Sequence, residues 1–431
     1  MPFDPDRVRS RFPALAMTDD GVPRIYLDNP AGTQVPVAVA DAMADCLLRK
    51  NANLGGYFVT SDAAVEVVAE SRAAMVDLLN APSVDEIVFG ANMTTITFHL
   101  SRSIARLLQP GDEIILSRMD HDANVWPWML MARDCGFVIK WLPFNRETFE
   151  FDLDDLDELL SSRTRLLCVG GASNLTGTIN DVATICGKAR DAGAMTFIDA
   201  VQSVPHIATD VQQLGCDFLT CSAYKFFGPH QGILWGRREL LERLEPYRVR
   251  PAPQGIPGCF ETGTMNHEGC AGVTAAVDYL ASLGNEMAGE FMPRWSHFEG
   301  RRQALHAAMD FLFDHETTLA ERLIARLQDI DGVTVQGITA TDAMQRRVPT
   351  VAFTHSSVTS ADIAKALGEK NIFVWSGHNY AVEVARTLGI YDSGGAVRVG
   401  PVHYNTVAEI DEFGDALVSI VASDVSRSNG A

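Results

Sequence analysis

One lysine in the sequence follows an apolar segment, a position that indicates a catalytic role rather than a solvent-exposed charge. Lys225 lies in the stretch DFLTCSAYKFFGPHQG at residues 217–232, between a segment typical of a buried strand and a turn rich in glycine and proline. Lysine is almost never fully buried without a partner. Burial lowers the pKa of an amine and makes it a better nucleophile and proton carrier near neutral pH. The sequence therefore predicts a covalent, catalytic role for Lys225.

Further polar residues follow other strand-like segments, at the ends where an open parallel sheet binds its ligands. These residues are His121, Asn174, Asp199 and Gln202. Thr94 and Thr95 begin a predicted helix, so their hydroxyl groups and the free backbone N–H groups there could bind an anion. Taken singly, each residue has an ordinary structural interpretation, such as an N-cap for a threonine. Taken together, they predict one site.

A lysine, an aspartate, a histidine and an anion site in one crevice are what pyridoxal 5'-phosphate requires. The lysine amine condenses with the cofactor aldehyde, the aspartate pairs with the pyridinium nitrogen, and a flat ring stacks on the cofactor face. Hydroxyl and amide groups at a helix start hold the phosphate. We therefore predict that Lys225, Asp199 and His121 are the catalytic residues of a pyridoxal-phosphate site.

The elements that must position these residues are short apolar segments that alternate with amphipathic ones. The predicted strands are 86–90, 112–117, 137–144, 165–171, 194–200, 217–223 and 232–237. Strands that alternate with helices indicate an α/β domain around one mostly parallel, seven-stranded sheet with flanking helices. Helical patterns dominate from about 270 to 330, and strand patterns at 347–355 and 371–377 then flank a helical pattern at 360–370. This part predicts a smaller α+β domain.

The length and composition agree with two domains. A chain of 431 residues with 47% hydrophobic content can bury a large core and divide into about two or three domains. We expect the large cofactor-binding domain to comprise residues 21–284, and the small domain to comprise residues 1–20 and 285–431. The terminal residues SRSNGA, 426–431, are expected to be disordered.

The charge and the cysteines narrow the class of protein. A net charge of −20 argues against nonspecific nucleic-acid binding, which needs a basic face. The start of the chain has no apolar run after a basic segment, so we expect a cytoplasmic protein without a membrane partner. Eight cysteines without a C-x-x-C pair favour reduced, buried thiols over disulfides or a zinc site, and no bound metal is expected.

The sequence resembles a fold-type I, class V pyridoxal-phosphate-dependent enzyme of the aminotransferase and cysteine-desulfurase superfamily. The resemblance runs from YLDNPAGTQVP at 26–36 to AVRVGPVHYNTVAEIDEF at 396–413, and its motifs are specific as an ordered set. It implies that Lys225 forms the Schiff base with the cofactor, that Asp199 pairs with the pyridinium nitrogen and that His121 stacks on the ring. The implied cofactor-binding residues are Thr94, Thr95, His121, Asn174, Asp199, Gln202, Ser222, Tyr224, Lys225 and Thr264.

The resemblance also implies a substrate site and a second subunit. Arg398 matches the arginine that binds the substrate carboxylate, a role that suits a planar, bidentate guanidinium. The implied substrate-binding residues are Arg398, Asn174, Tyr380 and His378. Thr264, in FETGTMN, matches a residue that the family donates from the neighbouring subunit to the phosphate. The expected partners are therefore a small amino-acid substrate and a second copy of the chain in a homodimer.

The departures from the desulfurase pattern bear on the reaction. In the segment FVWSGHNYAVEV, Tyr380 stands where the desulfurases carry the cysteine that receives sulfur as a persulfide. Trp375 replaces a usual basic residue, and Tyr224 replaces the usual histidine before the lysine. The sequence therefore predicts that the persulfide-accepting thiol is missing, and that Tyr224 reaches the phosphate through its hydroxyl group.

Removal of a substrate α-proton by Lys225 leads to several reactions, and the sequence does not choose among them. We favour a desulfurase-like lyase that cleaves a Cβ–S or other Cβ–heteroatom bond by β-elimination, because such a reaction needs no thiol acceptor. A class V aminotransferase that uses an oxo-acid co-substrate is the close alternative. An epimerase, a desulfurase that uses Cys259, and a non-catalytic cofactor-binding module remain open. The aromatic residues Trp375, Tyr380, Tyr57 and Phe58 favour an apolar, aromatic or bulky thioether side chain over free cysteine.

Overall fold

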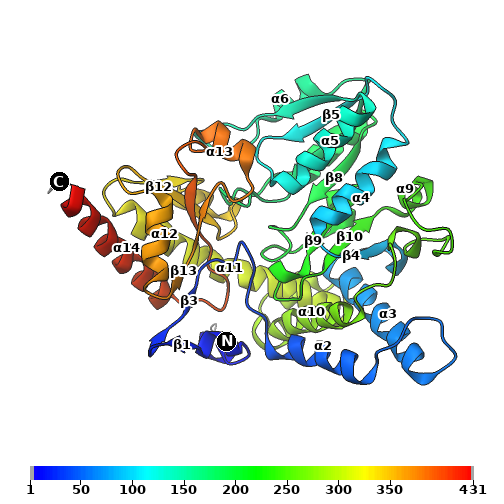
Figure 1. Cartoon of the computed structure of the whole chain (residues 1–431), viewed down its shortest axis with the longest axis horizontal. Coiled ribbons are helices and arrows are strands. Elements are labelled where there is room, and N and C mark those ends of the chain that lie inside the picture. The colour runs from blue at the N-terminus through cyan, green and yellow to red at the C-terminus, as the bar shows by residue number, and fades with distance from the viewer. Residues whose placement is uncertain (1–3, 429–431) are drawn as a thin grey trace.

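The computed structural model describes residues 4–428 of the chain and is built around a seven-stranded sheet (Figure 1). Its strands are β4 (Ile87–Gly90), β5 (Glu113–Ser117), β6 (Val138–Leu142), β7 (Thr164–Gly170), β8 (Met195–Asp199), β9 (Phe218–Ser222) and β10 (Gly232–Gly236). The spatial order is β4-β10-β9-β8-β7-β5-β6, and only the pairings of β10 are antiparallel. The predicted α/β fold with a mostly parallel sheet is therefore confirmed.

Helices cover both faces of this sheet, which explains its continuous apolar strands. Along β10, Ile233 and Trp235 pack into one core, whereas Leu234 between them packs into the other. The helices that cover the first face are α2 (Val37–Arg49), α3 (Val59–Leu79), α7 (Val182–Asp191) and α10 (His267–Met287). The helices on the second face are α4 (Met93–Ala105), α5 (Trp126–Cys135) and α9 (Arg238–Arg243).

A second, four-stranded sheet lies beside the first one in Figure 1. Its strands, in spatial order, are β11 (Val333–Gln336), β12 (Val351–His355), β15 (Ala396–Val399) and β14 (Trp375–Gly377). All of its pairings are antiparallel, and α12 (Ser360–Gly368) and α14 (Val407–Ser428) pack against it. The smaller α+β unit predicted from the sequence is thus present.

The structure refines two predictions in this unit. The predicted strand 371–377 is divided, because β13 (Ile372–Phe373) pairs with β3 (Ile25–Tyr26) whereas β14 pairs with β15. Helix α14 continues through Ser428 into the segment that was expected to be disordered, and residues 429–431 lie outside the described residues.

The long helix α11 (Gly300–Gln328) connects the two units. Its first half contributes Leu305 and Leu312 to the core of the large sheet, and its second half contributes Leu319 and Leu327 to the core of the small sheet. The domain limits near residues 20 and 284 remain a prediction. Within the described residues, no helix is long and apolar enough to span a bilayer, and no cluster of His, Cys, Asp and Glu side chains could hold a metal ion.

One buried histidine of α11 makes stability depend on pH. His306 is 1% exposed, neither ring nitrogen has a hydrogen-bond partner, and Trp295 and Phe298 lie against its ring at 4.7 and 4.8 Å between centroids. Burial lowers the pKa of His306 from 6.5 to about 4. Between these pH values the unfolded chain binds the proton and the folded chain does not, so acidification destabilises the fold.

We expect urea unfolding to show this effect directly. The wild type should lose about 2 kcal/mol of unfolding free energy between pH 7 and pH 5 through His306. His306→Phe keeps a flat apolar ring and removes the titrating group, so its loss over the same range should be smaller by that amount. Equal losses in the two proteins would contradict this assignment.

Candidate active site

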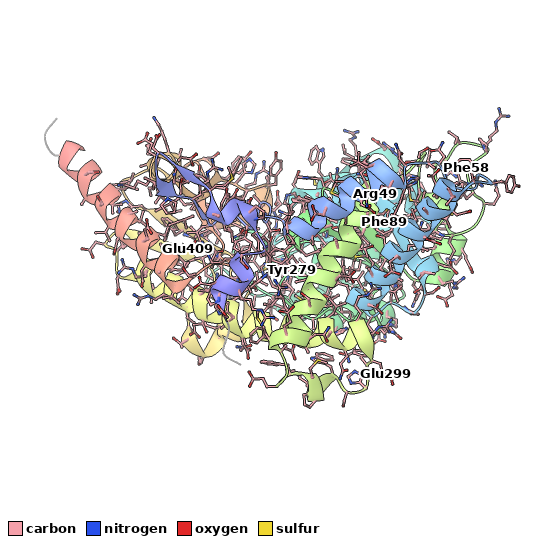
Figure 2. The ribbon with its side chains drawn as sticks, turned by 90° about the horizontal axis from the view of Figure 1, so that it is seen from below. Arg49, Phe58, Phe89, Tyr279, Glu299 and Glu409 are labelled. Atoms are coloured by element: carbon pink, nitrogen blue, oxygen red, sulfur yellow. The ribbon has the colours of Figure 1, made fainter. Side chains whose placement is uncertain are left out.

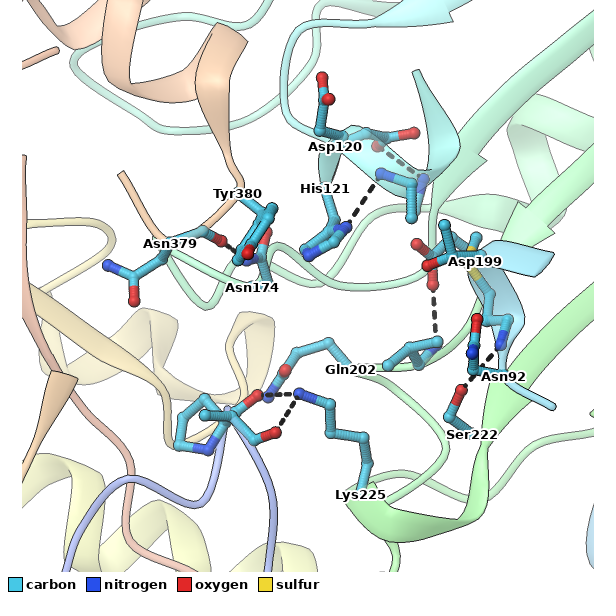
Figure 3. A pocket seen from close by; sticks show the side chains of 18 of the residues that line it. Asn92, Asp120, His121, Asn174, Asp199, Gln202, Ser222, Lys225, Asn379 and Tyr380 are labelled. Carbon is cyan, nitrogen blue, oxygen red and sulfur yellow. Dashed lines mark hydrogen bonds between the residues drawn. The ribbon is translucent and has the colours of Figure 1, made fainter. Parts of the chain in front are cut away.

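A cavity of about 650 Å³ opens where the carboxyl ends of the parallel strands meet the small sheet (Figure 3). It is lined by most of the residues predicted from the sequence, namely Thr94, His121, Asn174, Asp199, Gln202, Ser222, Tyr224, Lys225, Tyr380 and Arg398. Strand ends from one edge of the sheet converge at this place, as the topology of a parallel sheet requires. The predicted constellation is thus a single site in space.

Lys225 ends a short turn, Ala223–Lys225, directly after β9. Its Nζ donates hydrogen bonds to the carbonyl oxygens of Pro30 and Ala31, the latter at 3.0 Å. Desolvation lowers the pKa of Lys225 to about 7, and the positive charge of Arg398 acts in the same direction, against Asp28 and Asp199. A large fraction of this amine is therefore neutral near pH 7, as a nucleophile or base requires.

Asp199 is the last residue of β8 and is 7% exposed. Its Oδ1 accepts a hydrogen bond from the backbone N–H of Val201 at 3.0 Å, which fixes the carboxylate within the cavity. Burial raises the pKa of Asp199 to about 6, and the nearby Lys225 charge opposes this shift. Such a carboxylate gains from a cationic partner, and a protonated ring nitrogen can supply one.

His121 precedes a short turn, Asp122–Asn124, after β5. Its Nδ1 accepts the backbone N–H of Ala123 at 3.0 Å, and burial lowers its pKa to about 3, so the ring is neutral and offers a flat face. The ring of Tyr380 already stacks near it, with centroids 5.5 Å apart and planes at 23°.

Asp120, which sequence reasoning missed, anchors the turn that carries His121. Its carboxylate accepts hydrogen bonds from the Ser117 hydroxyl at 2.6 Å, the Gly170 N–H at 2.8 Å and the Asn124 side-chain amide at 2.7 Å. Burial raises the pKa of Asp120 to about 7. The sequence signal was available, because Asp120 directly precedes His121.

The two threonines predicted for phosphate binding differ in position. Thr94 lines the cavity, whereas Thr95 belongs to the capping box of α4: its N–H donates to Asn92 Oδ1 at 2.9 Å and its hydroxyl to the Asn92 carbonyl at 2.8 Å. Ser222 lines the cavity beside the helix start and accepts the Met93 N–H at 3.1 Å. The N-terminus of α4, Thr94 and Ser222 together offer donors to an anion.

Several predicted residues lie outside this cavity. Thr264 is exposed and shares a neighbouring pocket of about 460 Å³ with Thr95. His378 stacks on Tyr391, with ring centroids 5.7 Å apart, and does not line the cavity. Tyr57 and Phe58 are exposed at the start of α3, and Cys259 lines a separate surface pocket.

Arg398 on β15 brings a buried positive charge into the cavity from the small sheet. It is 5% exposed, its Nη1 donates to the carbonyl oxygen of Asn174 at 3.1 Å, and its Nη2 lies 3.7 Å from Oδ1 of Asp28. Desolvation lowers the pKa of Arg398 to about 10, so the group stays charged at neutral pH. Asp28, like Pro30 and Ala31, was not identified from the sequence, although all three lie in the motif YLDNPAG.

Buried polar atoms without a hydrogen-bond partner indicate that the cavity suits a polar ligand. Four buried atoms of its lining residues lack a hydrogen-bond partner, namely Asn174 Oδ1, Gln202 Oε1, Asn379 Oδ1 and Arg398 Nε. Buried polar groups in proteins are almost always paired. These atoms, together with the Lys225 amine, the Asp199 carboxylate and the anion donors, fit a pyridoxal phosphate and an amino-acid substrate.

Comparison with known proteins agrees with this geometry. The sequence pattern described as "Aminotransferase class-V" matches residues 25–291 and 303–413, which is most of the chain. The chain belongs to the class-V aminotransferase family. As a class-V member it is a pyridoxal-phosphate-dependent enzyme of the cysteine-desulfurase-like type, which confirms the predicted family and cofactor.

Individual relatives place this class-V enzyme among desulfurase-like proteins. A probable cysteine desulfurase of Streptomyces coelicolor is 31% identical, and the match covers 96% of each chain. An aminotransferase-like protein of Gibberella zeae is 33% identical over 97% of this chain and 99% of its own length. A cysteine desulfurase of Thermococcus onnurineus superposes with a TM-score of 0.85 at 25% identity, covering 98% of this chain and 99% of the other. The fold is therefore the fold-type I architecture.

Proposed function

We propose that this class-V enzyme is a lyase that cleaves a Cβ–S or other Cβ–heteroatom bond of an amino acid by β-elimination, without a persulfide cysteine. The observation that carries the proposal is Tyr380, whose ring stacks near His121 at the position that the resemblance assigns to the sulfur acceptor. All eight cysteines lie within the described residues, and none of them lines the cavity. Cys259, the alternative sulfur acceptor, lies in another pocket.

The chain's own groups have distinct tasks in this proposal. Bound pyridoxal phosphate supplies an aldehyde for covalent attachment and an electron sink for the α-carbon. Lys225 would take the α-proton with an amine whose pKa is lowered to about 7, and Arg398 would bind the α-carboxylate and so orient the Cα–H bond. Asp199 would keep the ring nitrogen of the bound cofactor protonated, and His121 would cover the ring face. The electron pair left by the α-proton would form a Cα–Cβ double bond as the leaving group departs from Cβ with its bonding electrons, and water would convert the released enamine into ammonia and an oxo acid.

Remaining polar groups would hold the cofactor in place. Thr94 and Ser222 are proposed to bind the phosphate at the start of α4, and Asn174 and Gln202 supply their unpartnered side-chain oxygens near the ring and the substrate. Tyr224 lines the same cavity, and its ring stacks on His230 at 4.9 Å between centroids.

The walls of the cavity favour a substrate with a large apolar group. Trp375 and Tyr380 line it and are 54% and 64% exposed, and Trp126 and Phe98 line it as well. Aromatic surfaces of this kind gain binding energy when an apolar group covers them. We therefore propose an S-aryl, S-alkyl or similar apolar substituent on Cβ rather than the free thiol of cysteine.

A class V aminotransferase is the second candidate, and an epimerase is a weaker one. The resemblance to an aminotransferase-like protein at 33% identity favours the aminotransferase specifically. The aminotransferase and the epimerase both begin with removal of the α-proton, as the lyase does. They differ from each other in the atom or face to which the proton returns. A transaminase needs an oxo acid to complete its cycle, whereas a lyase needs none.

Product analysis separates these reactions. Cofactor-loaded enzyme is given S-benzylcysteine or cysteine without any oxo acid, and thiol, ammonia and pyruvate are measured. We expect the three products in equal amounts, with a higher kcat/KM for S-benzylcysteine than for cysteine. Product formation only after addition of an oxo acid would establish the aminotransferase instead. Efficient turnover of cysteine with no saturation by S-benzylcysteine would contradict the proposed substrate class.

We also propose that the enzyme is a homodimer in which Thr264 completes the neighbouring site. Thr264 is exposed and lies outside the cavity of its own chain. Large apolar side chains are exposed at the end of α2 and the start of α3, where Figure 2 shows Phe58 at the surface: Leu48, Tyr57, Phe58 and Val59. Exposed apolar side chains of this size are frequent at protein interfaces. Light scattering should give twice the mass of one chain, and a monomer at the concentrations used in activity assays would contradict the proposal.

A further inference from the structure

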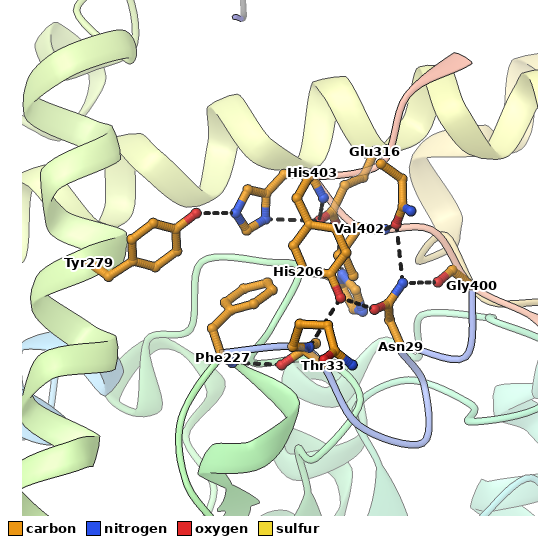
Figure 4. Close-up of polar contacts among 12 residues, drawn as sticks. Asn29, Thr33, His206, Phe227, Tyr279, Glu316, Gly400, Val402 and His403 are labelled. Atoms are coloured by element: carbon orange, nitrogen blue, oxygen red, sulfur yellow. Dashed lines mark hydrogen bonds and ion pairs between the residues drawn. The ribbon is translucent and has the colours of Figure 1, made fainter. Parts of the chain in front are cut away.

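The segment 28–33 after β3 is fixed at both of its ends. At one end the Asn29 side-chain amide donates to the carbonyl oxygens of Gly400, at 2.7 Å, and Tyr26, at 3.0 Å. At the other end the Thr33 hydroxyl accepts the Phe227 N–H at 3.0 Å (Figure 4). The segment thus joins the small-sheet unit, which carries Gly400, to the turn after Lys225.

Groups of this one segment contact both cationic side chains of the cavity. The carbonyl oxygens of Pro30 and Ala31 accept hydrogen bonds from Lys225 Nζ (Figure 3), and the carboxylate of Asp28 faces the guanidinium of Arg398. The Lys225 contacts are hydrogen bonds, whereas Asp28 is only loosely engaged. At 3.7 Å the pair is longer than the usual 2.7–2.9 Å of a charge-assisted hydrogen bond.

The loose pair leaves binding capacity unused on both sides. Oδ1 of Asp28 and Nε of Arg398 are both buried, and neither atom has a hydrogen-bond partner. A carboxylate that approaches Arg398 within hydrogen-bonding distance would therefore gain contacts that Asp28 does not make. The same carboxylate must overcome the negative charge of Asp28 to reach that position.

We propose that Asp28 is a positioning residue that holds Arg398 in the substrate-free enzyme and yields it to the carboxylate of the substrate. The inference rests on the proposed role of Arg398 as the carboxylate-binding residue. Asp28 then compensates a buried positive charge while the site is empty, since an uncompensated buried charge is costly. The compensation weakens anion binding, so removal of the Asp28 charge should strengthen it.

The titration of Asp28 gives a second way to see this competition. The charged groups that face Asp28 are Arg398 from β15 and Lys225 from the turn after β9. Burial raises the pKa of Asp28 to about 6, and both positive groups oppose that shift. As pH falls through this value Asp28 loses its charge and ceases to compete, so an anion should bind Arg398 more tightly at pH 5.5 than at pH 8.

The test measures binding of 3-phenylpropanoate and of its neutral amide to cofactor-loaded enzyme by calorimetry. Neither probe has an amine, so neither one can displace Lys225 from the cofactor. At pH 7.5 we expect Asp28→Asn to bind the carboxylate about tenfold more tightly than the wild type does, with little change for the amide. Asp122→Asn removes a partly buried carboxylate that lines the cavity and does not pair with Arg398, and it should change the carboxylate affinity by no more than about twofold.

Unchanged or weaker binding of the carboxylate by Asp28→Asn would overturn the proposal. If that variant does not fold, the wild type decides the question: the ratio of carboxylate to amide affinity should rise at least about fivefold from pH 8 to pH 5.5, and a constant ratio would overturn the proposal. Arg398→Leu tests the underlying role separately. If it keeps the wild-type preference for carboxylate over amide, the proposed role of Arg398 fails, whatever Asp28 does.

Discussion

Replacement of Lys225 by alanine is expected to lower kcat/KM at least about a thousandfold and to remove the visible absorbance of the lysine-bound cofactor. Lys225 is the cavity's only amine among the described residues, and its pKa of about 7 makes it both nucleophile and base at neutral pH. His121 does not duplicate this role, because its ring is neutral with a pKa of about 3 and its Nδ1 accepts the Ala123 N–H. Steady-state kinetics with S-benzylcysteine and an absorbance spectrum after reconstitution test the prediction.

A matched control separates this effect from a general loss of lysine charge. Lys188 on α7 pairs with Asp157 at the surface, at 2.6 Å, and does not line the cavity. Lys188→Ala should leave both the turnover and the spectrum unchanged, since an exposed ion pair contributes little. Retention of the visible band in fully loaded Lys225→Ala protein would contradict the assignment of the Schiff base.

Replacement of Glu316 by alanine is expected to lower the free energy of unfolding by about 3–5 kcal/mol. Glu316 on α11 is fully buried (Figure 4). Its Oε2 lies 2.7 Å from Nδ1 of His206, and its Oε1 accepts the backbone N–H of His403 at 3.0 Å. His403 in turn contacts the Tyr279 hydroxyl through Nε2 at 2.6 Å. Alanine would leave these donors buried without an acceptor.

The pH dependence of this network has a defined sign. Burial acts to raise the pKa of Glu316, but His206 and His403 outweigh it, so the pKa is lowered. The stabilisation by Glu316 is therefore present above the carboxyl's ordinary pKa of 4.5 and is lost as pH falls toward the lower folded value. Urea unfolding at neutral pH measures the effect, and Asp314→Ala, on the exposed face of the same helix, is the control at about 0.5 kcal/mol or less. A loss below about 1 kcal/mol for Glu316→Ala would contradict the assigned role.

The sequence predicted the large sheet well because its signal is local. Each strand is a short apolar segment that both faces bury, and each lies within a few residues of its predicted limits. The main site followed from the same local pattern. Asp199 ends β8, and His121 and Lys225 lie shortly after β5 and β9; parallel strands bring these carboxyl ends to one edge.

The features that the sequence did not predict depend on contacts distant along the chain. Asp28 meets Arg398 only because the segment after β3 crosses to the small sheet, and Phe373 leaves the predicted strand to pair with Tyr26. The ring of Tyr380 stacks near His121 in a turn where Asn379 and Tyr380 have positive φ angles of 51° and 56°. Neither position is a glycine, so the sequence does not indicate this backbone conformation. Such placements are set by tertiary structure and have no local pattern.

The visible spectrum of the loaded enzyme during one exposure to S-benzylcysteine, without oxo acid, tests the central claim most directly. Elimination regenerates the lysine-bound cofactor in each cycle, so we predict that its band returns when the substrate is exhausted and that ammonia equals the thiol released. A permanent conversion to the amine form of the cofactor, reversed only by an oxo acid, would contradict the lyase and establish transamination.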